Sequence, residues 1–374
     1  MSVIIGADIV PTTLNIELFV QGDAVGLVGE PLFNVLQAAD YRICNLEVPL
    51  TDQENPIDKN GPNLIAPTST VNGMKALGID LFTLANNHIM DQGEKGFMDT
   101  AEALKDAGIE RVGADTNLEE ASHPFYFEVK GKKYGIYACA EHEYSIAGTN
   151  KPGANPFDPL ESPDHVAAMK KVCNYVIVLY HGGKEHYRYP SPHLQKVCRK
   201  LVEKGADLVV CQHSHCIGCM ENYRHGTIVY GQGNFIFRKK SKDNEYWNTG
   251  LLIQIDNTGK IDFIPIEKNG DGIRLAEGEK GKYILKAFKD RSEEIKDPGA
   301  IISNYRKLAN EFIPSYLLCF SGLSGNFFFR VANKLSKRKM QIWISKRIKK
   351  KYGIEIRNYA ECEAHRELLI EGLK

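Results

Sequence analysis

The chain has 374 residues, more than one typical domain, which predicts two domains or one domain with an appendage. Its hydrophobic fraction of 43% and charged fraction of 25% are those of an ordinary soluble globular protein. Lys plus Arg and Asp plus Glu both number 47, so the total charge argues neither for nor against a polyanionic partner. Nine cysteines, an odd number without small-domain spacing, argue against a disulfide framework.

The N-terminus begins at once with an apolar segment, Ser2-Val-Ile-Ile-Gly-Ala-Asp8, rather than with basic residues followed by an apolar run. This pattern predicts no signal peptide. No uninterrupted apolar run is long enough to span a bilayer, so we expect no transmembrane helix. A reduced, cytoplasmic setting, peripheral to a membrane at most, is the location that we expect.

Short apolar runs alternate with segments of helical periodicity over the first 211 residues. The apolar runs predict strands at 2–8, 40–46, 79–84, 133–139, 174–180 and 207–211. The helical spacing predicts helices at 31–39, 71–77, 94–108 and 192–205. This order is typical of an α/β fold with a mostly parallel or mixed sheet that helices cover on both faces.

After Gly226 the character changes to short strands, at 227–230, 251–255 and 261–266, and the turn residues Asn257-Thr-Gly259 predict a hairpin between the last two. Beyond Gly281 we expect only helices, at 297–311, 326–351 and 360–373. We therefore divide the chain into a domain at 1–270 and a helical C-terminal region at 281–374.

Polar side chains that can bind a metal follow several of these strands. The stretch Leu84-Ala-Asn-Asn-His-Ile-Met-Asp-Gln-Gly93 joins a strand to a helix and carries more polar groups than a turn needs. Similar residues stand at other strand ends, and the set is Asp8, Glu47, Asn87, His88, His181, His213 and His215. Because the carboxyl ends of parallel strands meet along one edge, these residues are expected to converge.

Carboxylate, amide oxygen and imidazole without thiolate are ligands that suit zinc, manganese, iron or magnesium in an open catalytic site. The alternative for any one of these residues is a polar loop with an incidental histidine. Several such coincidences at separate strand ends favour the metal site.

The polar motifs, taken in order, resemble those of the bacterial capsule-synthesis CapA (poly-γ-glutamate) family, which is similar to the calcineurin-like metallophosphoesterases. The resemblance covers roughly residues 3 to 267. Its motifs are Asp8, Glu47-x-Pro49, Asn86-Asn-His-x-x-Asp-x-Gly93, His181-Gly-Gly-x-Glu185, His213-Ser-His215 and Gly231-x-Gly-Asn-Phe235.

The resemblance implies a four-layer αββα sandwich with mixed sheets and a site for one or two divalent ions (Mn, Zn, Fe or Mg). By position, Asp8 would hold the first metal together with His215, and Glu47 would bridge both. Asn87, His181 and His213 would hold the second metal. His88 would be the catalytic acid, with Asp91 and Glu185 orienting imidazoles.

Two positions depart from the phosphoesterase pattern. Val10 stands where those enzymes carry a histidine two residues after the first aspartate, which removes a nitrogen ligand from the first metal. Gln212 stands where glycine usually precedes His-x-His, and would either crowd the loop or offer an amide to the substrate.

We therefore expect a metal-dependent hydrolase of a phosphoester or of a γ-glutamyl or other amide bond, acting on an anionic or polymeric substrate in capsule or extracellular polymer synthesis. Val10 and the basic C-terminal segment at 312–351 motivate an alternative, a non-catalytic peripheral-membrane scaffold or polymer-handling subunit with a degraded metal site. A nuclease-type phosphodiesterase is a third possibility.

Two weaker signals lie elsewhere in the chain. Cys216-Ile-Gly-Cys219 resembles half of a zinc site, but one pair without a second favours buried structural cysteines. Residues 330–351 contain ten Lys or Arg and no Asp or Glu. With the apolar segment before them, residues 312–351 predict a basic amphipathic region that an anionic membrane surface would attract. Nucleic acid is a less suitable partner, because aromatic residues are not interleaved along the basic face.

Overall fold

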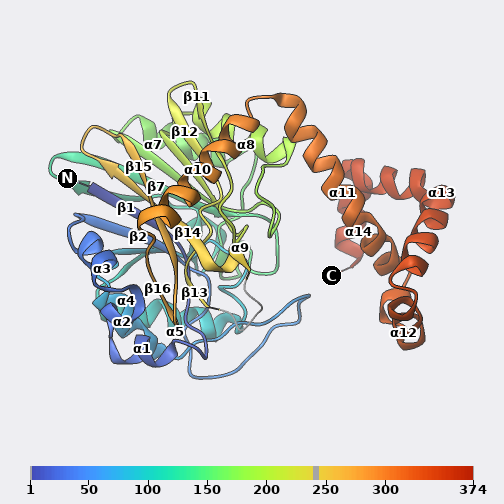
Figure 1. Ribbon diagram of the computed structural model, residues 1–374, viewed down its shortest axis with the longest axis horizontal. Coiled ribbons are helices and arrows are strands. Elements are labelled where there is room, and N and C mark those ends of the chain that lie inside the picture. The colour runs from blue at the N-terminus through green and yellow to red at the C-terminus, as the bar shows by residue number, and fades with distance from the viewer. Residues whose placement is uncertain (1, 239–243, 374) are drawn as a thin grey trace. The chain divides into compact units, whose positions relative to one another are not determined.

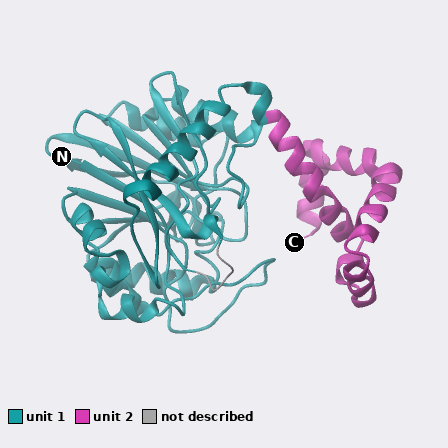
Figure 2. Ribbon diagram, in the orientation of Figure 1, with its two compact units in different colours: residues 1–301 teal, residues 302–374 magenta. Residues whose placement is uncertain are grey.

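A computed structural model describes residues 2–238 and 244–373. The chain forms two compact units, one that ends at Ile301 and one that begins at Ile302 (Figure 2). The first unit contains all the strands of the described residues, and the second is helical.

Two mixed sheets form the centre of the first unit (Figure 1). The larger sheet contains the parallel strands β1 (Ser2–Val10), β2 (Tyr41–Leu46), β3 (Leu81–Thr83) and β4 (Glu110–Val112), with β13 (Asn234–Phe237), β14 (Thr249–Asp256), β15 (Ile261–Asn269) and β16 (Gly272–Leu275). The smaller sheet contains β6 (Phe125–Val129), β7 (Lys132–Ala140), β9 (Tyr175–His181), β10 (Leu208–Gln212), β11 (Met220–Tyr223) and β12 (Gly226–Tyr230). Strands β5 (Ala114–Asp115) and β8 (Gly153–Ala154) form a small ribbon.

The side chains of the smaller sheet alternate between two apolar cores, as the period-2 geometry of a strand requires. Ile136, Ile177 and Val210 lie in the core shared with the larger sheet. Tyr137 and Val178 lie in a second core beneath the helices α7 (Ser162–Lys170) and α8 (Pro192–Glu203). The two sheets therefore pack face to face.

A second group of helices covers the other face of the larger sheet (Figure 1). These are α1 (Ile16–Gln21), α2 (Ala24–Val28), α3 (Glu30–Gln37), α4 (Val71–Ala76) and α5 (Gly93–Ala107). Phe19, Leu32 and Phe97, which they contribute to the core, are fully buried. The layers are thus helix, sheet, sheet and helix, which confirms the four-layer α/β sandwich.

The hairpin predicted at 257–259 joins β14 to β15, with Ile255 opposite Ile261. The carboxylate of Asp256 accepts hydrogen bonds from the backbone N–H groups of Thr258 and Lys260, and Gly259 has a φ of 92°. This turn fixes the register that carries the sheet on to β16. Two short helices, α6 (Leu118–Ala121) and α9 (Glu245–Asn248), lie in connections of the first unit.

Residues 281–301, which the sequence analysis grouped with the C-terminal helices, belong to the first unit. Helix α10 (Gly278–Glu294) buries Ile284 and Phe288 in the core of the sheets. The proposed division of the chain into a domain at 1–270 and a helical region at 281–374 stays a prediction. The second unit contains most of α11 (Pro298–Phe320), followed by α12 (Phe327–Leu335), α13 (Lys339–Glu361) and α14 (Glu363–Gly372). The helix expected at 326–351 is thus two helices.

Candidate metal centre

The residues expected to bind metal come from the carboxyl ends of strands in both sheets. Asp8 lies near the end of β1 and Glu47 follows β2, both in the larger sheet. His181 ends β9 in the smaller sheet, where it pairs in register with Gln212, so that His213 continues from the adjacent strand end. The expectation of a single sheet edge is therefore corrected, because the ligands face one another across the two sheets of the sandwich.

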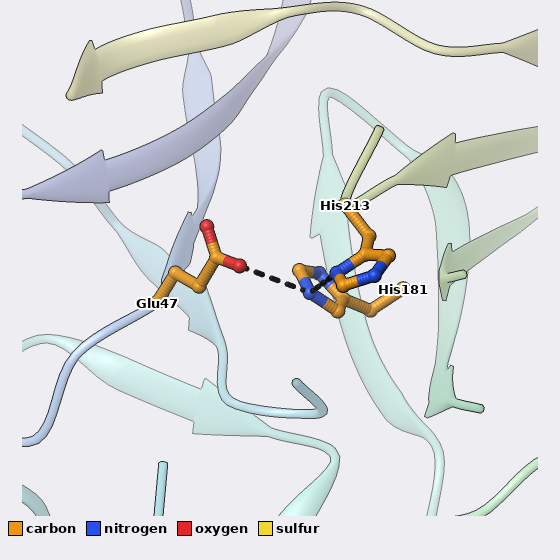
Figure 3. A group of neighbouring side chains, drawn as sticks. All are labelled: Glu47, His181 and His213. Atoms are coloured by element: carbon orange, nitrogen blue, oxygen red, sulfur yellow. Dashed lines mark hydrogen bonds and ion pairs between the residues drawn. The ribbon is translucent and has the colours of Figure 1, made fainter. Parts of the chain in front are cut away.

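The first candidate ion-binding group consists of Glu47, His181 and His213, whose ligand atoms lie within 4.8 Å of one another (Figure 3). The Nε2 atom of His181 lies 3.2 Å from Oε1 of Glu47 and 3.1 Å from Nδ1 of His213. The amide oxygen of Asn87 is also 3.1 Å from this Nε2 atom. These four donors surround one point between the sheets.

The second candidate group consists of Asp8, Glu47 and His215. The Nδ1 atom of His215 is 3.3 Å from Oδ2 of Asp8, and its Nε2 atom is 3.8 Å from Oε1 of Glu47. Glu47 belongs to both groups, so its carboxylate is positioned to bridge two ions.

Buried oxygen atoms of these carboxylates supply the test of whether a cation fits. Among the described residues, Oδ2 of Asp8 and both carboxylate oxygens of Glu47 accept no hydrogen bond, although both side chains are fully buried. Imidazole nitrogens lie 3.2 Å from Oε1 of Glu47 and 3.3 Å from Oδ2 of Asp8. A buried carboxylate oxygen that accepts no hydrogen bond costs several kcal/mol, by an order-of-magnitude estimate. A divalent cation would satisfy these atoms, and the donor set of oxygen and imidazole fits such an ion.

The electrostatics of the group show the same demand for positive charge. Burial lowers the pKa of His215, but Glu47 and Asp8 outweigh that effect and raise the pKa to about 9. Burial raises the pKa of Asp8, but the imidazole of His215, 3.3 Å from Oδ2, outweighs burial and brings this pKa below its ordinary value. Burial and the neighbouring His181 hold the pKa of His213 well below its ordinary value. His213 is therefore neutral and able to offer a lone pair.

The backbone of the loop after β10 is strained at two of these histidines. His213 has a φ of 82° and His215 a φ of 49°, in the left-handed region that non-glycine residues rarely adopt. Each such residue costs about 1–3 kcal/mol. Hydrogen bonds from His186 N to Ser214 O, at 2.8 Å, and from Ser214 Oγ to Cys216 O, at 3.2 Å, hold the loop in this conformation. The strain allows both imidazoles to point into one site.

His88 lies beside the metal groups and is linked to a buried ion pair. Its Nδ1 atom is 2.6 Å from Oδ2 of Asp91, which also accepts a hydrogen bond from the backbone N–H of Leu64 at 2.6 Å. The ammonium of Lys59 is 2.5 Å from the other oxygen of Asp91 and 3.3 Å from Nδ1 of His88. The side chain of Lys59 is only 3% exposed. The sequence analysis missed Lys59, because it lies in a polar loop without periodicity.

The side chains of Asn45, Asn234 and Glu143 hold candidate ligands in place. Glu185 does not. Asn45 donates to Asp8 Oδ1 at 2.8 Å, Asn234 Oδ1 lies 2.9 Å from Nδ1 of His215, and Asn87 donates to Glu143 at 2.9 Å. Glu185 is exposed and forms no hydrogen bond or ion pair with another described residue. The structure therefore does not support the orienting role expected for it.

The two departures from the pattern and the cysteine pair have structural explanations. Val10 is buried in the apolar core and offers no ligand atom. Gln212 donates to the backbone oxygen of Gly6 at 3.2 Å and to Gln232 at 3.3 Å, so it ties the two sheets together rather than facing a substrate. Cys216 and Cys219 are buried free thiols.

Comparisons with known proteins match this region of the chain. The family model described as "Bacterial capsule synthesis protein PGA_cap" matches residues 23–239, more than half of the chain. The capsule biosynthesis protein CapA of Bacillus anthracis is 32% identical over 244 residues, which cover 62% of this chain and 59% of that protein. The PGA biosynthesis protein CapA of Bacillus subtilis is 28% identical over 253 residues, 66% of this chain and 65% of that protein. The chain thus spans less than two thirds of the length of these relatives.

Solved structures give more distant likenesses. A phosphatase from Mycoplasma pneumoniae has a TM-score of 0.46 at 15% identity, covering 72% of this chain and 94% of that one. A putative 5'-nucleotidase from Staphylococcus aureus has a TM-score of 0.43 at 13% identity, covering 77% and 58%. Likenesses this distant do not assign an activity. The sequence match over residues 23–239 is sufficient for the family: the chain belongs to the bacterial capsule synthesis protein PGA_cap family.

Proposed function

We propose that the chain is a metal-dependent hydrolase that cleaves a phosphoester or a γ-glutamyl or other amide bond during the synthesis of a capsule or extracellular polymer. One observation carries the proposal: buried carboxylate oxygens of Asp8 and Glu47 accept no hydrogen bond from the described residues and lie close to three imidazoles, in groups whose ligand atoms are within 4.8 Å of one another. The relatives named for capsule and PGA biosynthesis support an anionic polymer as the substrate.

The proposed ligands are Asp8 and His215 on one side of Glu47, and Asn87, His181 and His213 on the other side. A divalent ion held there would supply an activated water and would offset negative charge that develops on the substrate oxygen. We infer either one or two ions, of Mn, Zn, Fe or Mg, because the two groups share Glu47 and Val10 adds no ligand to the first.

His88 is the proposed catalytic acid. Because its Nδ1 atom is bound to Asp91, Nε2 is the ring nitrogen available for proton transfer to the leaving oxygen. The contact with Asp91 fixes the orientation of the ring. Lys59 neutralises the second oxygen of Asp91, which completes a buried His–Asp–Lys chain next to the ligands.

The test separates metal binding from turnover. Purified protein is loaded with Mn²⁺, its metal content is measured by mass spectrometry, and hydrolysis is assayed with bis-p-nitrophenyl phosphate, γ-glutamyl-p-nitroanilide and an oligonucleotide. We expect Glu47→Gln to lose bound metal, and His88→Asn to keep the metal but lose on the order of 100-fold or more in kcat. Glu185→Gln, an exposed carboxylate on a neighbouring loop, is the matched control and should change neither.

Equal turnover in His88→Asn and the unchanged protein would remove His88 from the mechanism. Cleavage of the oligonucleotide alone would favour the nuclease-type phosphodiesterase.

A second candidate function is a non-catalytic, peripheral-membrane scaffold or polymer-handling subunit. Val10 favours it, because a buried valine stands where a further nitrogen ligand is expected from the resemblance. This candidate predicts a folded protein that hydrolyses none of the three substrates with Mn²⁺, Zn²⁺, Fe²⁺ or Mg²⁺. Turnover with any of them that is lost in Glu47→Gln contradicts it.

A further inference from the structure

Helix α12 carries a stripe of apolar side chains that the second unit leaves exposed. Phe327 is 69% exposed, Phe328 80%, Val331 43% and Leu335 80%. At about 100° per residue, the four side chains fall within one arc of roughly 100° on the helix. An arc of this width is the apolar face of an amphipathic helix, which in a globular protein normally packs against a core.

Positive charge is concentrated around this apolar stripe. Ten Lys or Arg and no Asp or Glu lie in residues 330–351, and none of the ten forms an ion pair within residues 2–238 and 244–373. Arg330 and Lys334 border the stripe on α12 itself. With Lys337 and Arg338, they line a cavity of about 690 Å³ bounded by residues of α11, α12 and α13. The four cations suit the cavity to an anionic group, and its volume admits a lipid phosphate.

The stripe and the cavity are fixed parts of one folded unit. Asn333 of α12 and Gln341 of α13 exchange hydrogen bonds of 3.0 and 3.1 Å, and Gln341 also donates to Ser315 of α11 at 3.1 Å. Lys337 and Arg338 have φ values of 50° and 65°, which make the sharp turn between α12 and α13. The cations are thus held next to the apolar stripe rather than on a loose tail.

We propose that the second unit docks on an anionic lipid surface, with Phe327, Phe328 and Leu335 entering the headgroup boundary and the cavity cations binding a lipid phosphate. Charge decides between this partner and a second copy of the chain. A second copy would bring ten unpaired cations against ten of the same sign, whereas an anionic lipid surface complements them. No helix among the described residues is long and apolar enough to cross a bilayer, so docking takes place at the interface.

Aromatic residues reinforce this assignment. Trp343 of α13 is 56% exposed, and the guanidinium of Arg347 lies 4.6 Å from the centre of its ring. An aromatic ring with one apolar face and one cation-bearing face suits the boundary between lipid and water. Trp343 also provides a spectroscopic probe of docking.

The test is sedimentation of the full chain with vesicles of phosphatidylcholine alone or with phosphatidylglycerol added. We expect binding to the anionic vesicles only, weakening as salt is raised. The charge variant combines Arg330→Gln, Lys334→Gln, Lys337→Gln and Arg338→Gln. The apolar variant combines Phe327→Gln, Phe328→Gln and Leu335→Gln. Each should lower the partition coefficient by at least about tenfold.

Matched controls come from exposed residues of the first unit. The charge control combines Lys280→Gln, Lys282→Gln, Lys286→Gln and Lys289→Gln on α10, which removes the same charge. The apolar control combines Leu160→Gln and Val172→Gln, which are 79% and 54% exposed. Both controls should bind vesicles as the unchanged chain does. The Trp emission should shift to the blue on binding, and Trp343→Phe should abolish that shift.

Circular dichroism checks that the variants keep their helices, and no residue of the metal centre takes part, so the result is independent of hydrolase activity. Three outcomes would overturn the proposal. The first is that the unchanged chain fails to bind anionic vesicles. The second is that the α10 control loses as much binding as the α12 variants. The third is that the apolar variant abolishes a dimer seen by analytical ultracentrifugation while its vesicle binding stays the same. If an oligonucleotide displaces the chain from vesicles and added anionic lipid does not, the result would favour nucleic acid as the partner of the second unit.

Discussion

The two units of the chain distribute polar and apolar side chains in opposite ways. The first unit buries carboxylates and imidazoles between its two sheets, whereas the second unit exposes phenylalanine and leucine on α12. Each arrangement has a free-energy cost for an isolated protein, since buried charge lacks solvation and exposed apolar surface orders water. In the two proposals above, an ion bound to the first unit and a lipid surface bound to the second would remove these costs. The comparison therefore assigns the two proposals to separate units, hydrolysis to the first and membrane docking to the second.

The largest effect on stability should come from replacing a phenylalanine by alanine in the first unit, compared with the same replacement in the second unit. Phe97→Ala removes a fully buried ring of α5 and should lower the free energy of unfolding by about 3–5 kcal/mol. Phe328→Ala removes a ring that is 80% exposed and should change it by less than about 0.5 kcal/mol. Urea unfolding of both variants measures the contrast. A comparable loss in Phe328→Ala would mean that α12 packs against a core in solution.

A smaller effect on stability is expected from replacing a lysine by methionine, once in each unit. Lys59→Met leaves Asp91 with a buried, uncompensated charge and should cost roughly 3 kcal/mol of stability. The loss of stability is limited because Asp91 keeps its hydrogen bonds with Leu64 and His88. Lys334→Met is the control, because Lys334 lies on an exposed helix and pairs with no carboxylate in the described part of the chain. Thermal unfolding of metal-free protein checks both, and equal melting temperatures would contradict the burial of Lys59.

The smallest effect concerns two ion pairs with the same i,i+4 spacing. Asp99 of α5 is paired with Lys95 and accepts a hydrogen bond from Thr51 at 2.5 Å, whereas Arg357 and Glu361 of α13 form an exposed pair at 2.8 Å. Burial raises the pKa of Asp99, but Lys95 and Thr51 outweigh it and bring the pKa below the ordinary value of 3.8. Asp99→Asn should therefore cost a few tenths of a kcal/mol at neutral pH.

This contribution is fully present above the unfolded-state pKa and is lost as pH falls through the lower folded-state pKa. The difference between Asp99→Asn and the unchanged chain should accordingly shrink as the pH is taken below about 4. Glu361→Gln, in the exposed pair, is the control and should change the free energy of unfolding at neutral pH by no more than a few tenths of a kcal/mol. Urea midpoints measured across this pH range test the sign, and a difference that grows on acidification would contradict it.

Much of the sandwich follows from the sequence, because burial on strands and helices imposes periods that can be read in the chain. The alternation of apolar runs and helical segments predicted β1, β2 and β9, which place Asp8, Glu47 and His181 at or near their carboxyl ends, and the turn at 257–259 predicted the β14–β15 hairpin. The tertiary structure decided that two sheets, rather than one, bring these ends together. The reason is that a strand's sequence reports which of its faces is buried but not which sheet it joins.

The environment of the site depended still more on tertiary packing. Glu185 follows His181 as closely as the motif requires, yet its side chain is exposed, while Asn45 and Asn234 contact Asp8 and His215. Lys59 lies in a loop with no periodic pattern, and its burial follows only from how that loop packs against Asp91. The sequence therefore determined the candidate ligands that stand at strand ends, since strand periodicity fixes their positions. Contacts between residues far apart in the chain decided which groups orient those ligands, because such contacts leave no local pattern in the sequence.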